Sequence, residues 1–286
     1  MAGPAAAAFV VGPAPEIRGE AAGEGPAIVL CHGITATRRY VVHGSRSLER
    51  AGHTVVSYDA RGHGESDPAP TAEGYGYPQL IVDLERVVAA EVGEGRFVLA
   101  GHSMGAHTAV GYALAHPDRL AGLVVIGPTY LGEIRPSSLE YWDGLATALE
   151  SGGIEAFVEY IGDKQGIDAT WRDSVLRFSR ERMLLHRRPE ELVRALHEVP
   201  GSRPFGSLEE LRGLELPALI VASRDEADPG HPHAAARAYA EALPQARLIS
   251  EAEGESPLAW QGGKLSREIA AFCAEPAVVA ASQSSL

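Results

Sequence analysis

A serine between two glycines places the strongest restriction on the fold of this chain. Residues 101–105 read Gly-His-Ser-Met-Gly, with the apolar run 97–100 before them and the helical pattern 106–116 after them. This context predicts a sharp strand-to-helix turn that exposes the Ser103 hydroxyl above a sheet. Glycines suit such a turn because its backbone is strained and a neighbouring Cβ would clash. The helix N-terminus beside Ser103 also favours developing negative charge. We therefore predict that Ser103 is a nucleophile.

The rest of the first half alternates between apolar runs and helical patterns. Short runs rich in Val, Ile and Leu, separated by helices, are typical of a parallel sheet covered on both faces. The crossovers should be right-handed. The expected strands are 27–31, 54–58, 97–100 and 123–126, and the expected helices are 38–51, 78–91 and 106–116.

The pattern changes after residue 128, where a long stretch without strand character begins. We expect this stretch to be a helical cap over residues 129–211, inserted into a core formed by 25–128 and 212–275. Residues 1–24 are expected to be a loosely ordered lead-in and 276–286 a frayed tail. The expected cap helices are 137–150, 154–160, 169–186 and 189–197; the later strands are 218–222 and 247–250, with helices 233–243 and 265–273.

Composition excludes several classes of function. The formal net charge of −13 argues against a nucleic-acid partner, which would need clustered Lys and Arg. No apolar run approaches the roughly 18 residues of a membrane span. Cys31 and Cys273 are expected to be buried free thiols, which suits a reducing cytoplasm. Without a Cys/His ligand cluster or a dinucleotide fingerprint, we expect neither a metal nor another cofactor.

The loop after the strand 27–31 supplies a second element of a catalytic site. His32-Gly33 can turn the backbone N–H of Ile34 toward Ser103, and this N–H would form an oxyanion hole with the N–H of Met104. We expect His32, and likewise His63 and His102, to be structural histidines in turns rather than bases.

Taken together, these motifs resemble the α/β-hydrolase superfamily over residues 26–273. The resemblance is carried by the His32-Gly33 loop, the segment Asp-Ala-Arg-Gly-His-Gly-Glu-Ser at 59–66, the turn at 101–105 and the strand–loop–helix around Asp228. It implies an eight-stranded, mostly parallel sheet with helices on both faces and a helical cap. It also implies a catalytic triad in the order nucleophile, acid, histidine. Related dehalogenases and epoxide hydrolases use an aspartate nucleophile, so Ser103 argues against both activities.

Two aspartates compete for the role of the acid. Asp228 is followed by Pro232 four residues later, as the family usually shows after its catalytic acid, and is favoured over Asp225. The other interpretation of either aspartate is a carboxylate that caps a helix or stabilises a turn.

The base is where the sequence departs from the family. Glu255 occupies the slot expected for histidine, and no histidine follows His233. A carboxylate with a pKa of about 4.3 is a weak base toward an alcohol. Three hypotheses remain: Glu255 acts as a base with a raised pKa in a dry pocket, His231 on the loop of the candidate acid substitutes as the base, or the site is catalytically weak and binds a ligand. The favoured interpretation of His231 itself is an ordinary histidine of a surface loop.

The leading prediction is a serine hydrolase acting on an ester or a related acyl bond. A non-hydrolytic ligand-binding or auxiliary protein is the alternative, and a lyase or cyclase is a weaker one. The substrate should be small to medium in size and partly apolar, because the predicted cap is rich in aromatic residues. The basic stretch 177–188 could attract an anion, although a solvated helix face is the favoured interpretation. The aromatic residues are Tyr130, Tyr141, Trp142, Phe157, Tyr160, Trp171 and Phe178.

Overall fold

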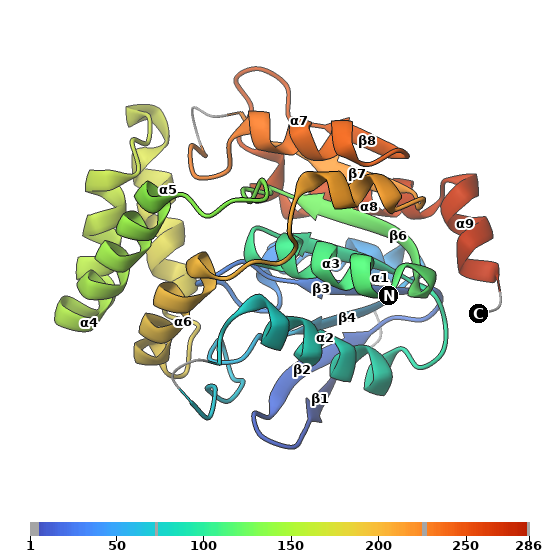
Figure 1. Cartoon of the computed structure of the whole chain (residues 1–286), viewed down its shortest axis with the longest axis horizontal. Helices are drawn as coiled ribbons and strands as arrows, with labels where there is room; N and C mark the ends of the chain where they lie inside the picture. The colour runs from blue at the N-terminus through green and yellow to red at the C-terminus, as the bar shows by residue number, and fades with distance from the viewer. Residues whose placement is uncertain (1–5, 72–73, 225–227, 285–286) are drawn as a thin grey trace.

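The computed structural model describes residues 6–71, 74–224 and 228–284. Its centre is an eight-stranded sheet in the order β1-β2-β4-β3-β5-β6-β7-β8 (Figure 1). The pairs from β4 to β8 are parallel, whereas β1–β2 and β2–β4 are antiparallel. This is the α/β-hydrolase fold that the sequence predicted. The strands are β1 Ala7–Val11, β2 Ile17–Ala22, β3 Ala27–Cys31, β4 Thr54–Tyr58, β5 Phe97–His102, β6 Leu120–Ile126, β7 Ala218–Val221 and β8 Ala246–Ile249.

Helices cover both faces of the sheet because its central strands are apolar on both sides. Successive side chains of a strand point to opposite faces, so Val124 and Val125 belong to two different cores. One core is closed by α2 Tyr77–Glu91, α3 Met104–Ala115 and α7 His233–Ala242. The other is closed by α1 Ser47–Arg50, α8 Gly262–Cys273 and α9 Pro276–Gln283. Cys31 and Cys273 are buried, one in each core, and neither forms a disulfide.

The expected loose lead-in is wrong, because residues 7–22 form the antiparallel edge of the sheet. Gly19 lies opposite Tyr58 of β4, and a Cβ at Gly19 would lie 2.2 Å from the Phe9 ring. Ile17 is fully buried. The segment 17–22 has little strand propensity of its own, so its pairing with β4 rather than its local pattern makes it a strand.

Two helix expectations are also corrected. The stretch 38–51 forms only a 3-10 turn at Tyr40–Val42 and the short α1, because His43 and Gly44 have positive φ angles of 46° and 73°. The expected frayed tail instead forms α9, whose Val278 is buried against the sheet. The residues 1–5 and 285–286 lie outside the described part of the chain.

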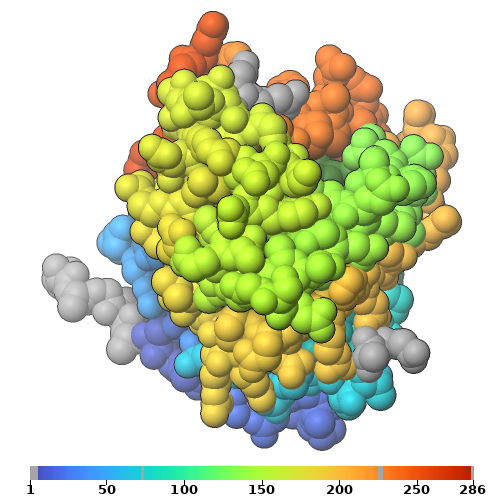
Figure 2. All heavy atoms as spheres, turned by 90° about the vertical axis from the view of Figure 1, so that its left-hand side faces the viewer, coloured from blue at the N-terminus to red at the C-terminus, as the bar shows by residue number. Residues whose placement is uncertain are grey.

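The segment between β6 and β7, residues 127–217, is called here the helical insert. It contains α4 Pro136–Lys164, α5 Ala169–Met183 and α6 Leu192–Glu198, which share their own apolar core. The expected break near residue 152 is a kink within α4, where Gly153 has a φ of 66°. The insert lies beyond one end of the sheet and covers that face of the molecule (Figures 1 and 2). The division into core and cap domains stays a prediction.

Short 3-10 turns complete the chain. They are η1 Tyr40–Val42, η2 Pro117–Arg119, η3 Pro189–Glu191, η4 Val199–Gly201, η5 Leu208–Gly213 and η6 Leu258–Trp260.

Candidate functional site

Ser103 lies on a tight turn between β5 and α3. Its backbone angles are φ 53° and ψ −116°, and its N–H donates to the Ile126 carbonyl at 2.9 Å. A Cβ at Gly101 would lie 2.1 Å from the Gly105 carbonyl oxygen, and one at Gly105 would lie 2.1 Å from the Cys31 carbonyl oxygen. Both distances are too short for any other residue, so the two glycines are required by the packing of the turn.

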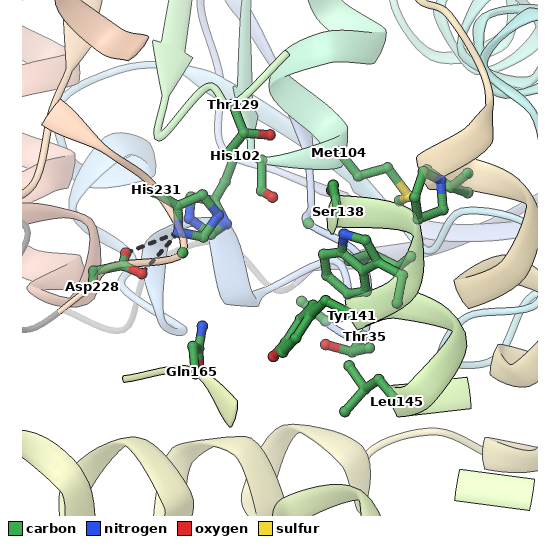
Figure 3. Close-up of a pocket in the computed structure, with 18 of the residues that line it drawn as sticks. Thr35, His102, Met104, Thr129, Ser138, Tyr141, Leu145, Gln165, Asp228 and His231 are labelled. Atoms are coloured by element: carbon green, nitrogen blue, oxygen red, sulfur yellow. Dashed lines mark hydrogen bonds and ion pairs between the residues drawn. The ribbon is translucent and has the colours of Figure 1, made fainter. Parts of the chain in front are cut away.

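The turn faces a cavity of about 450 Å³ that lies between the sheet and the helical insert. Figure 3 shows Tyr141 and Leu145 of α4 in this cavity, on the side away from His231 and Asp228. Ser103 is also part of its lining. The aromatic residues of the insert serve two purposes, because Tyr141 and Phe157 line the cavity and also belong to the core of the insert.

The two amides expected to form the oxyanion hole lie beside Ser103. Ile34 and Met104 line the cavity, and a Cβ at Gly33 would be 3.3 Å from the Ser103 Cβ. The Met104 N–H is the first of α3 and has no partner within the helix. Among the described residues, neither amide donates a hydrogen bond that would withdraw it from a ligand.

Two buried histidines hold the loop that carries Ile34. His32 donates from Nδ1 to the Gly33 carbonyl at 2.8 Å and accepts the Ala60 N–H on Nε2 at 2.9 Å, as expected of a structural histidine. His186, in the turn that follows α5, donates from Nε2 to the Thr35 carbonyl at 3.0 Å and accepts the Gly64 N–H on Nδ1. Burial lowers the pKa of His186 to about 4, so this link between the insert and the loop is neutral.

The loop between β7 and α7, which carries the candidate acid, brings Asp228 and His231 together. His231 Nδ1 lies 2.9 Å and 3.0 Å from the two carboxylate oxygens of Asp228, and both side chains line the cavity (Figure 3). Burial alone would raise the pKa of Asp228, but the charge and hydrogen bond of His231 lower it overall. Because the carboxylate accepts the proton of Nδ1, the Nε2 of a neutral His231 is left as an acceptor. Asp225, the other candidate acid, lies outside the described residues.

His102 packs against this pair without joining it. Its ring centroid lies 5.0 Å from that of His231, and its buried Nε2 has no hydrogen-bond partner. Burial, reinforced by His231, lowers the pKa of His102 to about 3. A ring that stays neutral at physiological pH supports the face of His231 without competing for the Asp228 carboxylate.

Glu255 does not lie with the other predicted site residues. Its side chain is 46% exposed, and its Oε2 lies 2.6 Å from Lys264 Nζ. The hydrogen bond to Lys264 lowers the Glu255 pKa, and Glu255 is not among the described residues that line the cavity. This position contradicts the hypothesis of a base with a raised pKa in a dry pocket, because Lys264 at the start of α8 holds the carboxylate at the surface.

The buried carboxylate of this region is Glu251, which sequence analysis missed. Its two oxygens accept the backbone N–H groups of Arg224 and Leu258, so it ties the loops after β7 and β8 together. No local pattern distinguishes Glu251 from the exposed glutamates near it, since its role depends on two loops that meet only in the fold.

Within 6–71, 74–224 and 228–284, no group of three or more His, Cys, Asp or Glu side chains is arranged to hold a metal ion. Over the same residues, no helix has both the length and the apolar character that a membrane crossing requires.

Comparison with known proteins settles the family. The family model described as the alpha/beta hydrolase fold matches residues 26–262. The chain belongs to the α/β-hydrolase family. Over 109 residues it is 36% identical to epoxide hydrolase B of Mycobacterium tuberculosis, a match covering 38% of this chain and 30% of the relative. It is 35% identical to the mouse sn-1-specific diacylglycerol lipase ABHD11, with 37% and 34% covered. The matched stretch thus spans about a third of these relatives.

Solved structures of this α/β hydrolase's fold cover nearly the whole chain. A thermophilic esterase from Thermogutta terrifontis superposes with a TM-score of 0.76 at 23% identity, covering 94% of this chain and 97% of the esterase. The enol-lactonase from Burkholderia xenovorans LB400 gives a TM-score of 0.76 at 21% identity, covering 94% and 100%. At these identities the likeness shows the fold alone.

Proposed function

We propose that this α/β hydrolase cleaves an ester or a related acyl bond, with Ser103 as nucleophile and His231 as base. The observation that carries the proposal is that one cavity is lined by Ser103 on its strained turn and by the bonded Asp228–His231 pair. The relatives named as a lipase, an esterase and a lactonase act on bonds of this class, which supports the same reaction.

In the proposed reaction, His231 Nε2 accepts the Ser103 proton as Oγ attacks the acyl carbon. The amides of Ile34 and Met104 then stabilise the negative charge on the former carbonyl oxygen. The His231 imidazolium then gives the proton to the departing alkoxide. In the second half of the reaction, His231 takes a proton from water as the water attacks the acyl-enzyme, and returns that proton to Ser103 Oγ as the acid product leaves. Asp228 keeps the proton on Nδ1 and stabilises the imidazolium, so a base and its orienting acid come from one short loop.

The proposed reaction requires a hydrogen bond from the Ser103 hydroxyl to His231 Nε2, which would form when substrate binds. Among the described residues, no hydrogen bond reaches the Ser103 hydroxyl, which lines the cavity. Catalytic hydrogen bonds are often long before substrate binds and tighten in the complex. The same observation favours the second candidate function, a protein that binds its ligand in this cavity without hydrolysing it.

Labelling with a fluorophosphonate probe distinguishes the two functions. A hydrolase should be labelled at Ser103, and Ser103→Ala should lose both the labelling and the turnover of p-nitrophenyl esters. The folded state of the variant is checked by its circular dichroism spectrum and its melting temperature. An unlabelled wild-type protein that turns over no ester at high enzyme concentration would overturn the proposal and leave ligand binding as the function.

A further inference from the structure

Arg182 is a cation in the wall of the cavity without an anionic partner. It lies in the last turn of α5 and lines the cavity with Ser103. Its Nε is buried and has no hydrogen-bond partner. Within the described residues, no carboxylate lies within ion-pair distance of its guanidinium.

Arg180, on the same helix, shows how an arginine of α5 is paired when it faces outward. Its guanidinium donates to both carboxylate oxygens of Glu155, at 2.8 Å and 2.5 Å, on the exposed surface. The sequence favoured a solvated helix face for the basic stretch 177–188. The structure shows instead that its arginines lie in different surroundings. Arg180 has its counter-ion outside, whereas Arg182 projects into the cavity without one.

The groups around Arg182 can complete an anion site but cannot neutralise it. Tyr40 and Tyr141 both line the cavity, and the Tyr40 hydroxyl donates to the Phe178 carbonyl at 3.4 Å. Burial raises the pKa of Tyr141 to about 12, so its phenol remains a hydrogen-bond donor. His43 is neutral, because burial lowers its pKa, and it is bonded to the Ala259 carbonyl. Asp228, the carboxylate of this wall, is bonded to His231.

A guanidinium whose Nε is buried without a partner is unfavourable, and arginine does not relieve this by losing its proton. Burial lowers the pKa of Arg182, while Tyr40, Tyr141 and Asp228 favour the charged form. Carboxylates fit a guanidinium through two parallel hydrogen bonds, so a carboxylate-bearing ligand would supply the missing partner. The chain has a formal net charge of −13, so its surface as a whole repels anions, and a cation without a partner in the cavity is a local exception that attracts them.

We propose that Arg182 binds a carboxylate carried by the substrate, with the phenol of Tyr141 as an additional donor. The inference rests on the proposed acyl hydrolysis and narrows it to esters or lactones that bear an acid group away from the scissile bond. The aromatic lining receives the apolar part of such a substrate, while Ser103 and Arg182 engage its two polar ends.

Matched esters test the proposal. The mono-p-nitrophenyl ester of glutaric acid and p-nitrophenyl valerate have acyl chains of equal length and differ in the terminal carboxylate. We expect wild-type kcat/KM to favour the anionic ester. Arg182→Gln should lower kcat/KM for that ester on the order of 10- to 100-fold, as for hydrogen bonds to charged groups. The neutral ester should change by less than about threefold in the same variant, because it makes no ionic contact. Arg180→Gln, with the same charge change on the outer face of α5, should spare both esters.

A second pair locates the carboxylate on the alcohol side of the substrate. 4-Acetoxybutyrate and butyl acetate carry the same acyl group, and a preference for the former that is lost in Arg182→Gln supports the proposal equally. Arg182→Lys, which retains the charge, should recover part of the preference and shows that a loss in Arg182→Gln does not arise from misfolding.

The two levels of the proposal fail in different ways. If wild-type protein hydrolyses the neutral and anionic members of both pairs equally well, and Arg182→Gln does not change that ratio, the role of Arg182 is overturned while acyl hydrolysis stands. If Ser103 is not labelled and no ester is hydrolysed, the proposed function itself fails.

Discussion

Single residues of the site are held by contacts that leave no room for substitution. Ser103 has a positive φ of 53°, and the glycines at either side lie against backbone carbonyl groups. A strained residue persists only where its surroundings determine its conformation. The strain at Ser103 is therefore maintained by the packing of β3, β5 and α3 against one another.

Gly105→Ala should destabilise the fold. Its Cβ would lie 2.1 Å from the Cys31 carbonyl oxygen, so α3 must move away from β3. We expect a loss of about 1–3 kcal/mol or more in the free energy of unfolding, as for other overpacked sites. Urea unfolding measures it. Gly95→Ala is the matched control, because a Cβ there has no atom within 4 Å. Equal stability of the two variants would contradict this account of the turn.

Glu255→Gln should leave esterase activity unchanged within about twofold, because an exposed carboxylate paired with Lys264 lies outside the cavity.

His231→Gln should lower kcat by roughly 10³-fold or more, since it removes the proposed base. His197→Gln controls for loss of a surface histidine, as His197 is about half exposed and bonded to Asp143. Steady-state kinetics on p-nitrophenyl esters decides, and a large loss in Glu255→Gln with none in His231→Gln would reverse the assignment of the base.

At the scale of elements, the site depends on contacts between the helical insert and the loops of the core. The turn after α5 reaches the loop that follows β3 through His186, which bonds to both Thr35 and Gly64. Thr35 has a positive φ of 65°, so the loop is held in a conformation that its own sequence does not favour. The orientation of the Ile34 amide thus depends on an element about 150 residues away.

His186→Ala tests this connection. The substitution leaves the Gly64 N–H and the Thr35 carbonyl without a partner, each costing about 1–3 kcal/mol when buried. We expect a lower free energy of unfolding and a kcat reduced by roughly tenfold or more, because the proposed oxyanion donor at Ile34 loses its position. Leu185→Ala, at an exposed neighbouring position, should change neither quantity. An unchanged kcat in His186→Ala would show that the loop holds itself.

At the scale of the whole molecule, several buried histidines are uncharged in the folded state. His107 accepts the N–H groups of Thr129 and Tyr130 on Nε2 and donates from Nδ1 to the Tyr77 hydroxyl. Burial lowers the pKa of His107 to about 3 and that of His186 to about 4. A proton on the accepting nitrogen would remove those bonds, so acid opposes folding at positions spread over the molecule.

Stability should therefore decrease between pH 6.5 and pH 4.5. The unfolded histidines bind protons near pH 6.5, while the folded ones stay neutral down to about pH 4 or pH 3. Where the unfolded state binds more protons than the folded state, stability rises with pH. The contribution of these histidines to the free energy of unfolding is therefore complete above pH 6.5 and is lost as the pH falls. Each histidine contributes up to about 1.4 kcal/mol per pH unit.

Melting temperatures from pH 7.5 to pH 4.5 measure this dependence. His107→Gln should be less stable at pH 7.5 but show a shallower decrease, by about one proton. A melting temperature that stays level over this range, or a His107→Gln slope equal to that of wild type, would contradict the prediction.

The sequence by itself determined the features of this α/β-hydrolase-family chain that are encoded locally. The apolar runs of β3 to β8, the glycine-flanked turn at Ser103 and the acid loop at Asp228 each follow from residues within a few positions of one another. Backbone propensity, turn chemistry and burial act over that range, so these features can be predicted without knowing the fold. The family resemblance extends the prediction to eight strands, but no local pattern indicated β1 and β2.

Only the tertiary structure decided which distant side chains meet. The strands β1 and β2 exist because β4 offers an open edge, and α9 forms because Val278 finds an apolar face. Glu255 points to the surface because Lys264 lies beside it, whereas Arg182 points inward although its neighbour Arg180 does not. Pairing and burial of this kind depend on residues far apart in the chain, and the free energy of a charge is set by the partner and the solvent it meets after folding.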